Sequence, residues 1–450
     1  MSRPALRVLR GGRAPQRIGV LGGGIAGLAS AWFLLRAGYR PVVLEATAQL
    51  GGVGTHFEHA GYTLDRFCHV MVDSDADLCG LVDDLGLRDV LHWSRSGMGF
   101  HVDGRLYGFN TPLDLLRFGA LGVTDRVRAG LGALYITRTR RNALALDDVP
   151  ARQWLLRIFG RRAYERIWDP LLRAKFGDRR DGVPAYWVWN ALNLEKNGSP
   201  KVKGYPRCGY RGLAEALGRG IAAGGGEVRL ASPVDALEAQ PAGIRLVTGR
   251  STETVDAVIS TLPLQLLRGL AQGALRRQVP LPDLAYQGIV SVLVVARRRL
   301  GRFYRTVVVD RAFPFQGLVE TTHVIPPEWI GGRHLIHVMK HCDAVSEAYG
   351  RAEEVLERQA VDGLCRLYPH FQASDIEATY VFRAPDVEPV WTLGRLRRRL
   401  APRVADTRLY VCTAAQAYPR FMTWNTSVAL AKETVTALTA DLGQTTAEAA

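Results

Sequence analysis

The residues with the clearest chemical meaning are three glycines and one glutamate near the start of the chain. Gly22, Gly24 and Gly27 form a GxGxxG pattern after an apolar run, and Glu45 ends a second apolar run. Glycines at this spacing permit a tight turn, a close approach of backbone to a pyrophosphate and a close helix-strand contact. An acid about 20 residues further on accepts the hydroxyls of an adenosine ribose and argues against a 2′-phosphate. The pattern predicts a dinucleotide site.

A strand, a helix and a second strand must position these residues. Apolar residues predict strands at 18–21 and 42–44, and the spacing of apolar residues over 25–35 predicts a helix that ends at Gly38. The phosphates would rest on the N-terminus of this helix, where backbone amides have no partner within the helix. The residues predicted to surround the pyrophosphate are Gly22, Gly24, Ile25, Ala26 and Gly27.

The uncharged run 18–35 follows a basic segment, so a signal peptide or a membrane anchor is an alternative. Five glycines interrupt this run, all within its first ten residues. An export signal gives no reason for the sequence VVLE and the pair Gly51 and Gly52 to follow in register. We therefore favour the nucleotide site.

The segment after Glu45, EATAQLGGVGTHFEHAGYTLDRFCH, identifies the nucleotide. Gly51 and Gly52 let the backbone pass close to a second phosphate, as in an extended large dinucleotide. Here the chain resembles the superfamily of FAD-containing amine oxidases and protoporphyrinogen oxidases, in which a Gly-Gly-Arg motif follows the glutamate. Val53 stands where the arginine is usual, which makes the chain more similar to the protoporphyrinogen-oxidase-like branch than to the monoamine oxidases.

Further segments resemble this superfamily in family order, as far as LYVCTAAQAYPRFMTWNTSVALAKETV near the C-terminus. The resemblance spans essentially the whole chain. It implies FAD as the cofactor and an α/β fold, in which a Rossmann-like FAD-binding domain is interleaved with a substrate domain of mixed sheet and helical cap. The FAD-binding pieces would be 15–95, 205–275 and 392–440. The substrate domain would combine a mainly helical 96–204 with a strand-rich 276–391, and the flavin ring would lie between the two domains.

The resemblance also assigns cofactor contacts to particular residues. Glu45 would bind the ribose, Gly52 and Val53 the phosphate region through backbone groups, and Val234 the adenine through its backbone. Thr413 falls where the superfamily commonly has the Asp of a Gly-Asp pair, which leaves the ribitol contact without its carboxylate.

A helix near the C-terminus is expected to support the flavin. Thr426 and Ser427 precede the predicted helix SVALAKETV, whose N-terminal dipole would stabilise negative charge at the N1/O2 edge of a reduced flavin.

Residues that face the substrate follow from the same resemblance. His69 and the stretch from Glu320 to His323 are the polar groups expected to face the ring, and they are the catalytic candidates. Tyr418 and Trp424 would form aromatic walls around the substrate. The alternative for each is packing, since a lone histidine is more often a satisfied structural donor.

Composition limits the remaining classes of function. The chain has 450 residues, of which 47% are hydrophobic and 22% charged, enough for a folded protein of two domains. Six scattered cysteines without a CxxC pair argue against a structural metal and suit a reducing compartment, so we expect a cytoplasmic protein. We find no GxSxG, Walker or HExxH motif, and Lys175 is expected to be a surface or domain-junction charge.

The formal net charge of +15 raises the question of an anionic partner. The arginine clusters are dispersed and form no recognisable nucleic-acid-binding module, so we expect no nucleic acid partner. The segment 111–141 mixes apolar residues at helical spacing with a basic end. It could lie peripherally on the inner face of a membrane or form a cap over the active site, and we favour the cap.

The sequence as a whole predicts an FAD-dependent oxidoreductase that removes two electrons from a C–N or C–C bond of a small organic molecule. Reduced flavin would pass the electrons to oxygen, a quinone or another acceptor. Three alternatives stay open: a flavin-dependent isomerase similar to UDP-galactopyranose mutase, a membrane-associated desaturase or protoporphyrinogen oxidase acting on an apolar substrate, and a flavin-binding scaffold without turnover. The substrate, the acceptor, the catalytic base and the oligomeric state are left open.

Overall fold

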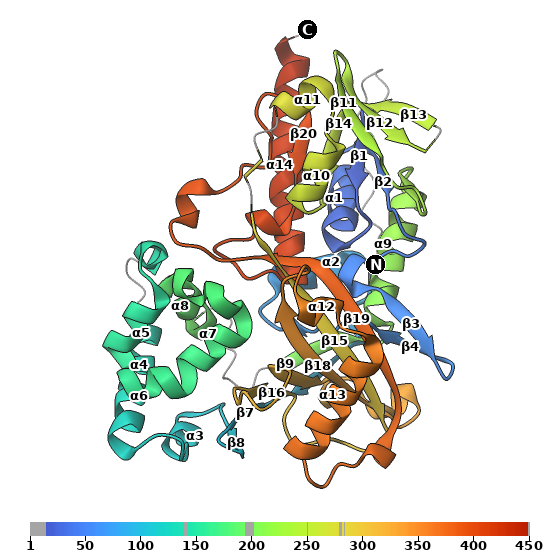
Figure 1. The fold of residues 1–450 in the computed structure, drawn as a ribbon. Helices are drawn as coiled ribbons and strands as arrows, with labels where there is room; N and C mark the ends of the chain where they lie inside the picture. The colour runs from blue at the N-terminus through green and yellow to red at the C-terminus, as the bar shows by residue number, and fades with distance from the viewer. Residues whose placement is uncertain are drawn as a thin grey trace.

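A five-stranded parallel sheet forms the nucleotide-binding half of the protein in the computed structural model, with strand order β10-β2-β1-β14-β20 (Figure 1). The central strand β1 lies between β2, the next strand along the chain, and β14, which comes from a distant part of the chain. The strands are β1 (Arg17–Leu21), β2 (Arg40–Leu44), β10 (Glu227–Arg229), β14 (Ala257–Ser260) and β20 (Leu409–Val411). The structure describes residues 15–138, 143–193, 202–249, 251–278, 281–282 and 284–448.

Helices cover one face of this sheet and a small antiparallel sheet covers the other. Helix α1 (Ile25–Arg36) packs against both α9 (Gly209–Ala223) and the long C-terminal helix α14 (Trp424–Glu448), which Figure 1 shows in red beside the blue α1. The opposite face carries β11 (Ala236–Gln240), β12 (Gly243–Thr248) and β13 (Ser251–Val255). Two short helices, α10 (Leu264–Leu270) and α11 (Gly273–Gln278), follow β14.

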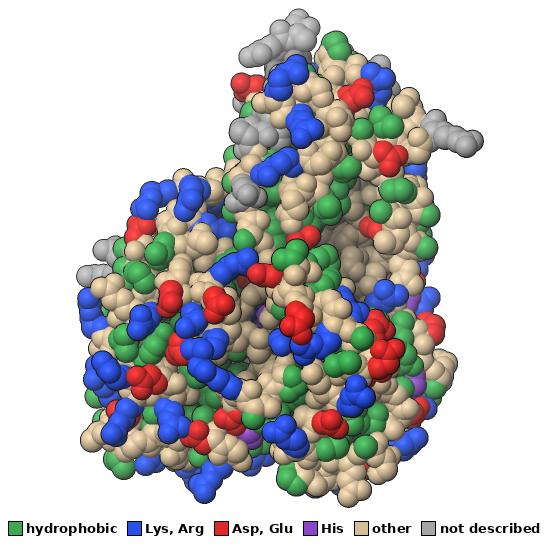
Figure 2. Space-filling model, viewed as in Figure 1, with side chains coloured by type: hydrophobic (Ala, Val, Ile, Leu, Met, Phe, Trp, Pro, Cys, Tyr) green, Lys and Arg blue, Asp and Glu red, His purple; other side chains and the backbone are tan. Residues whose placement is uncertain are grey.

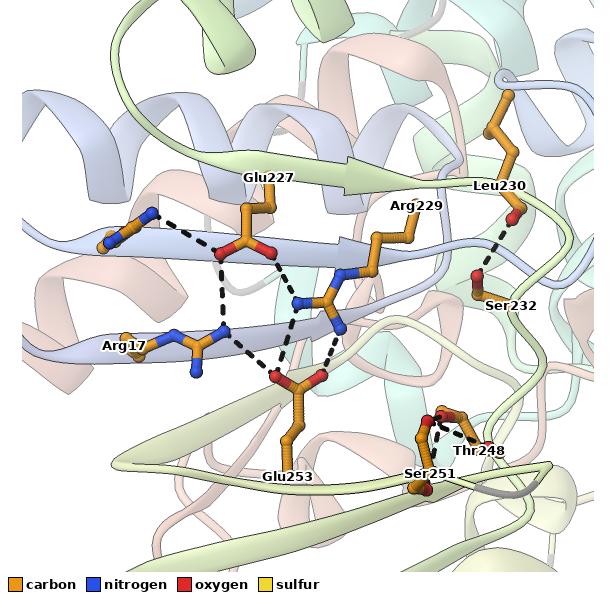
Figure 3. Close-up of polar contacts among 9 residues, drawn as sticks. Arg17, Glu227, Arg229, Leu230, Ser232, Thr248, Ser251 and Glu253 are labelled. Atoms are coloured by element: carbon orange, nitrogen blue, oxygen red, sulfur yellow. Dashed lines mark hydrogen bonds and ion pairs between the residues drawn. The ribbon is translucent and has the colours of Figure 1, made fainter.

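A charged network ties the two sheets together (Figure 3). Arg17 of β1 reaches Glu253 of β13 at 3.0 Å and Glu227 of β10 at 3.4 Å. Arg229 pairs with the same two glutamates, so two guanidinium groups alternate with two carboxylates. This part-buried network fixes the edge of the antiparallel sheet on the strands that carry the nucleotide site.

A seven-stranded mixed sheet forms the second half, with strand order β19-β15-β18-β17-β16-β7-β8. Helix α13 (Glu353–Leu367) packs on one face of this sheet, and a helical layer lies against the other. The short helix α12 (Glu347–Gly350) precedes α13. The strands are β7 (Met98–Val102), β8 (Arg105–Gly108), β15 (Tyr286–Ala296), β16 (Arg305–Val308), β17 (Gly317–Glu320), β18 (His334–Cys342) and β19 (Ile376–Pro389).

The helical layer comes from one stretch of chain, shown in green to teal at the left of Figure 1. Its helices share a core of aromatic and aliphatic side chains. They are α3 (Pro112–Leu116), α4 (Val123–Arg138), α5 (Ala151–Phe159), α6 (Arg161–Ala163), α7 (Asp169–Phe176) and α8 (Ala185–Asn193). The expectation of a mainly helical 96–204 misses β7 and β8. Strand β7 joins the sheet by pairing with the distant β16, and β8 pairs with β7.

Short strands connect the two halves. The hairpin of β3 (His56–His59) and β4 (Tyr62–Asp65) leads to a small sheet in which β9 pairs with both β5 and β6. The remaining elements of this region are β5 (Met71–Val72), β6 (Leu91–Arg95), β9 (Val202–Pro206) and α2 (Ala76–Asp84). The predicted fold class is confirmed: an α/β architecture with a Rossmann-like sheet and a mixed-sheet unit capped by helices.

Candidate cofactor and substrate site

The glycine turn after β1 leaves no room for side chains. Gly22 has φ +102°, a conformation that favours glycine, and a Cβ at Gly27 would lie 1.9 Å from the carbonyl oxygen of Gly22. A Cβ at Gly52 would lie 3.2 Å from the Cα of Gly24. Two bare backbone segments therefore meet above the first turn of α1, which fits a group as bulky as a pyrophosphate.

The helix that follows presents its free amides at this place. Gly24 is the N-cap of α1, and its carbonyl oxygen accepts the first intrahelical bond, from Leu28 at 2.9 Å. The amides of Ile25, Ala26 and Gly27 precede that bond and have no carbonyl oxygen within the helix to bind. These donors and the positive end of the helix dipole can bind phosphate oxygens.

Glu45 is held in the position that a ribose acceptor needs. Its carboxylate is 9% exposed and accepts hydrogen bonds from the amide of Gly23 at 2.6 Å and from the amide of Thr47 at 2.9 Å. Its own carbonyl oxygen accepts from the amide of Ser232 at 2.8 Å. This bond brings the segment that contains the half-buried Val234 beside Glu45, so the residues predicted to contact ribose and adenine lie close together.

His69 fixes the second glycine loop. Its Nε2 donates to the carbonyl oxygen of Val53 at 3.0 Å, and its ring lies 5.4 Å from that of Tyr210 and 5.8 Å from that of Trp424. Burial lowers the pKa of His69, with the bond to Val53 opposing this, so the imidazole is a neutral donor at pH 7. The side chain of Val53 is 43% exposed. His69 therefore positions the backbone near the predicted phosphate site.

Trp424 is part of the core under this loop. Its side chain is 7% exposed, and a Cβ at Gly54 would lie 2.3 Å from its Cζ2 atom. Trp424 was predicted to line the substrate. The structure places it instead against Gly54, His69 and Tyr210, because the loop has no side chain at Gly54 to keep the indole away.

The C-terminal helix begins earlier than predicted. Thr423 caps α14 through its hydroxyl, which accepts from the amide of Thr426 at 3.1 Å, and its carbonyl oxygen accepts from the amide of Ser427 at 2.9 Å. Thr426 and Ser427 therefore lie inside the first turn and do not precede the helix. Their buried position at the N-terminal end of α14 keeps them candidates for supporting the flavin.

Thr413 occupies the place of the usual aspartate without replacing its charge. Its side chain is buried, its amide donates to Oε1 of Gln416 at 2.9 Å, and its hydroxyl bonds the phenol of Tyr286. These local bonds use the polar groups of Thr413. The other backbone groups of this turn are therefore the candidates for contacting the ribitol.

Glu320 and His323 form a buried clamp instead of facing a ring. The carboxylate of Glu320 accepts from the amides of Leu300 and Gly301, each at 3.2 Å, and lies 3.3 Å from His323 Nε2. Burial raises the pKa of Glu320, but bonds from His323 and His334 outweigh this and lower it. Neither residue lines the cavities described below, so we correct the prediction that they are catalytic.

Tyr418 is likewise a packing residue. Its hydroxyl donates to the buried carboxylate of Asp147, and its ring lies 4.5 Å from that of Trp391. The residues of this segment that line the large cavity are Phe421 and Met422. Tyr418 anchors the segment in the helical layer and Phe421 takes the wall position predicted for it.

A cavity of about 740 Å³ lies between the mixed sheet and the helical layer. Its wall is mainly apolar and aromatic, and one ion pair crosses it: Lys175 Nζ of α7 lies 2.8 Å from Glu388 Oε2 of β19. Lys175 was expected to be a surface or junction charge, and the structure makes it a wall of this cavity. The apolar lining includes Met98, Phe100, Phe109, Trp168, Leu171, Trp187, Leu192, Val307, Met339, Phe421 and Met422.

A smaller cavity of about 470 Å³ adjoins the hairpin β3–β4. Asp65 lies in its wall and accepts a hydrogen bond from Tyr205 at 2.6 Å. Burial raises the pKa of Asp65 to about 7, although the bond from Tyr205 opposes the rise. His69 and His337 line the same cavity.

Strand β18 joins the two cavities. His337 lines the smaller cavity, and two and four positions later Met339 and His341 line the larger one. Burial is the main cause that lowers the pKa of His337 to about 3 and that of His341 well below its ordinary value, so both are neutral at pH 7. Cys68 Sγ lies 3.6 Å from Met339 Sδ, so the chain next to His69 runs over this strand. The glycine loop and the large cavity are thus connected through residues 67–70.

A Rossmann-like sheet with this glycine turn, a buried ribose acceptor and an adjoining cavity defines the class of dinucleotide-dependent oxidoreductases. Residues 25–422 match the family model for flavin-containing amine oxidoreductases, and the chain belongs to this family. The family is one of FAD-dependent oxidoreductases, and FAD is the cofactor that it implies for this chain. This confirms the predicted superfamily, enzyme class and cofactor.

Curated relatives and solved structures agree with the family. The chain is 24% identical over 185 residues to the mitochondrial protoporphyrinogen oxidase of Nicotiana tabacum, covering 40% of this chain and 37% of that protein. It is 25% identical over 287 residues to the 15-cis-phytoene desaturase of Synechococcus elongatus, covering 57% and 60%. The chain thus spans less than two thirds of these relatives. The structure of a reduced UDP-galactopyranose mutase shares the fold with a TM-score of 0.74 at 16% identity, covering 95% and 96%.

Sequence reasoning missed the ion pair in the wall of the large cavity. Lys175 and Glu388 come from segments 213 positions apart, and nothing local pairs them. A signal was present in strand β18, because His337, Met339 and His341 alternate along HLIHVMKHC and must share one face.

Proposed function

We propose that the protein removes two electrons from a C–N or C–C bond of an organic molecule bound in the 740 Å³ cavity. The observation that carries the proposal is the connection between this cavity and the nucleotide loops through residues 67–70. The bound FAD supplies the electron acceptor. A small-molecule substrate and a final acceptor such as oxygen or a quinone complete the reaction.

The chain itself supplies binding, orientation and a dry site. Phe100, Trp187 and Phe421 surround the substrate with apolar surface, which excludes water from the reacting bond. Lys175 and Glu388 neutralise each other at 2.8 Å, so they add hydrogen-bonding groups without net charge. His69 keeps its Nε2 proton on the carbonyl oxygen of Val53 and thereby holds the glycine loop in place.

The test is anaerobic mixing of the FAD-loaded protein with candidate substrates while the visible spectrum is recorded. Bleaching of the oxidised flavin bands by a substrate and their return on admission of oxygen or a quinone would support the proposal. Tight binding of a UDP-sugar only by the reduced protein would favour an isomerase. Bound flavin that neither a substrate nor dithionite reduces would favour a scaffold without turnover.

We infer that the outward face of α3 and α4 rests on a membrane. The opposite face packs as a cap: Ala129, Gly132 and Ile136 are buried against α5 and α8. No helix among the described residues has the length and apolarity needed to span a bilayer. The outward apolar side chains are between 44% and 68% exposed and comprise Leu113, Leu116, Val123, Val127, Leu131, Leu134 and Tyr135.

This apolar face has exposed arginines beside it, which favours an anionic bilayer as its partner. Arg117 directly follows α3 and Arg138 ends α4, and both side chains are exposed. On the face drawn in Figure 2, basic and acidic side chains are interspersed, as on a solvated surface. An apolar substrate could then reach the cavity from the bilayer, with the protein on the cytoplasmic side.

Co-sedimentation with vesicles of anionic lipid tests the contact. Leu131→Glu should lower the bound fraction several-fold, because it places a charge in the apolar face. Leu266→Glu is the matched control, since Leu266 is 53% exposed on α10, far from this patch along the chain. Equal binding by both variants and the unmodified protein would refute the membrane contact.

A further inference from the structure

The large cavity contains one cation that no described residue neutralises. Arg305 of β16 is exposed and lines this cavity, and its guanidinium has no hydrogen bond or ion pair with any residue in the described part of the chain. The other cation of the wall, Lys175, is neutralised by Glu388 at 2.8 Å. His341 is neutral because burial lowers its pKa well below the ordinary value, and the charges of Lys175 and Arg305 lower it further. The wall therefore carries a net positive charge at Arg305.

The sheet directs Arg305 toward the substrate. Residues of β16 alternate between the two faces: Thr306 is buried on the face of α13, where its hydroxyl lies 3.0 Å from that of Tyr368. Arg305 and Val307 are on the other face and both line the cavity. The charge of Arg305 also acts on Cys68, whose pKa is raised to about 11 by burial and lowered in part by this arginine. The guanidinium is thus close to the segment that joins the cavity to the nucleotide loops.

The other polar side chains of the wall are already committed to the protein. Asn110 bonds the backbone of Met98 through both its Oδ1 and its Nδ2, and Gln316 bonds the backbone of His341. Asn193 donates to two carbonyl oxygens. These amides hold the wall in shape. The indole N–H of Trp187 is a further buried donor without a partner, but it carries no charge, so Arg305 is the charged group of the wall without a partner among the described residues.

We propose that the substrate, or the part of it that binds here, is an apolar molecule that carries a carboxylate, and that Arg305 binds this carboxylate. This inference rests on the proposed function, since it places the ligand in the same cavity. A guanidinium presents two parallel donors to a carboxylate, which orients the bound acid as well as attracting its charge. A protonated amine would meet an uncompensated positive charge instead. Arg305 thus selects an acid over an alcohol or amine with the same hydrocarbon body.

Binding of three matched probes to the FAD-loaded protein tests this selection. Octanoate, octan-1-ol and octylamine share one chain, and the fluorescence of Trp168 and Trp187 in the wall reports their binding. Octanoate should bind about tenfold or more tightly than either of the others, which corresponds to about 1.4 kcal/mol. Arg305→Gln should remove this preference without weakening octan-1-ol, and Arg305→Lys should retain part of it.

Arg302→Gln is the matched control, because Arg302 lies three positions away and stacks on the ring of Phe303 at 4.7 Å without lining the cavity. It should leave all three affinities unchanged. Equal affinities for octanoate and octan-1-ol, or equal weakening of both by Arg305→Gln, would overturn the proposal. The result is independent of turnover: failure of flavin reduction would refute the proposed reaction, whereas loss of acid selectivity would refute only the role of Arg305.

Discussion

The close contact between α1 and the turn after β1 predicts a large effect from one methyl group. A Cβ at position 27 would lie 1.9 Å from the carbonyl oxygen of Gly22, and real Cβ atoms do not come within 3.0 Å of such an atom. The Gly27→Ala substitution therefore forces the helix or the turn to shift by about 1 Å. The amides of Ile25 and Ala26 that face the phosphates must shift as well.

Two opposing terms set the change in stability. Alanine in place of glycine stabilises an open helical position by about 0.5–1 kcal/mol, whereas overpacking a dense contact costs about 1–3 kcal/mol. We expect the FAD-free Gly27→Ala protein to lose about 1–2 kcal/mol of unfolding free energy. Loss of one hydrogen bond to a charged phosphate costs about 1.5–3 kcal/mol, so affinity for FAD should fall by about 10- to 100-fold.

Urea unfolding of the FAD-free protein and titration with FAD measure the two quantities separately. Gly80→Ala is the matched control, because Gly80 lies within helix α2 and a Cβ there would have no neighbouring atom within 4 Å. The control should be slightly more stable and should bind FAD normally. If Gly27→Ala behaves like Gly80→Ala in both measurements, the close approach of helix and turn does not shape the phosphate site.

Three further predictions concern buried charges. Lys175→Met should lower the free energy of unfolding, measured in urea, by about 1–3 kcal/mol, because it leaves Glu388 unpaired. Adding Glu388→Met should recover most of this loss. No recovery would mean that the two residues do not interact. Glu320→Gln should lower the free energy of unfolding by about 2–4 kcal/mol, because an amide cannot accept all the bonds made to the carboxylate. In the unmodified protein, the stabilisation by the ionised Glu320 should be present above about pH 4.3 and lost as the pH falls through its lowered pKa. Burial raises the pKa of Asp65 to about 7 in the folded protein, so as the pH rises this carboxyl ionises at a lower pH in the unfolded chain than in the folded one. The free energy of unfolding should therefore fall between about pH 4 and pH 7. Asp65→Asn should keep the bond from Tyr205 and remove that fall; an unchanged pH profile would refute the assignment.

The parts of the molecule that the sequence predicted are those controlled by neighbouring residues. The GxGxxG turn and Glu45 lie within one strand-helix-strand unit, where local backbone conformation decides the geometry. The start of α14 was missed although Thr423 is a typical N-cap residue, because the apolar Trp424 was assigned to a wall.

The cavity could not be predicted in the same way, because its contacts join distant segments. Glu320 stands in a polar stretch that suggests a site, but the loop at Leu300 folds back and uses both of its oxygens. Tyr418 bonds Asp147, which lies 271 positions earlier. Such pairs depend on how whole elements are packed, and single-sequence patterns contain no record of that packing.

The strand order β10-β2-β1-β14-β20 has a consequence for how the protein is made. Strand β20 begins at Leu409, and α14 packs against α1 from the far end of the chain. A ribosome that adds roughly 5–20 residues per second needs roughly 20–90 s to supply these elements after it has made β1. During that time the apolar faces of β1 and α1 have no native cover on one side, which makes the nascent chain a client for chaperones, and FAD can be captured only after synthesis is nearly complete.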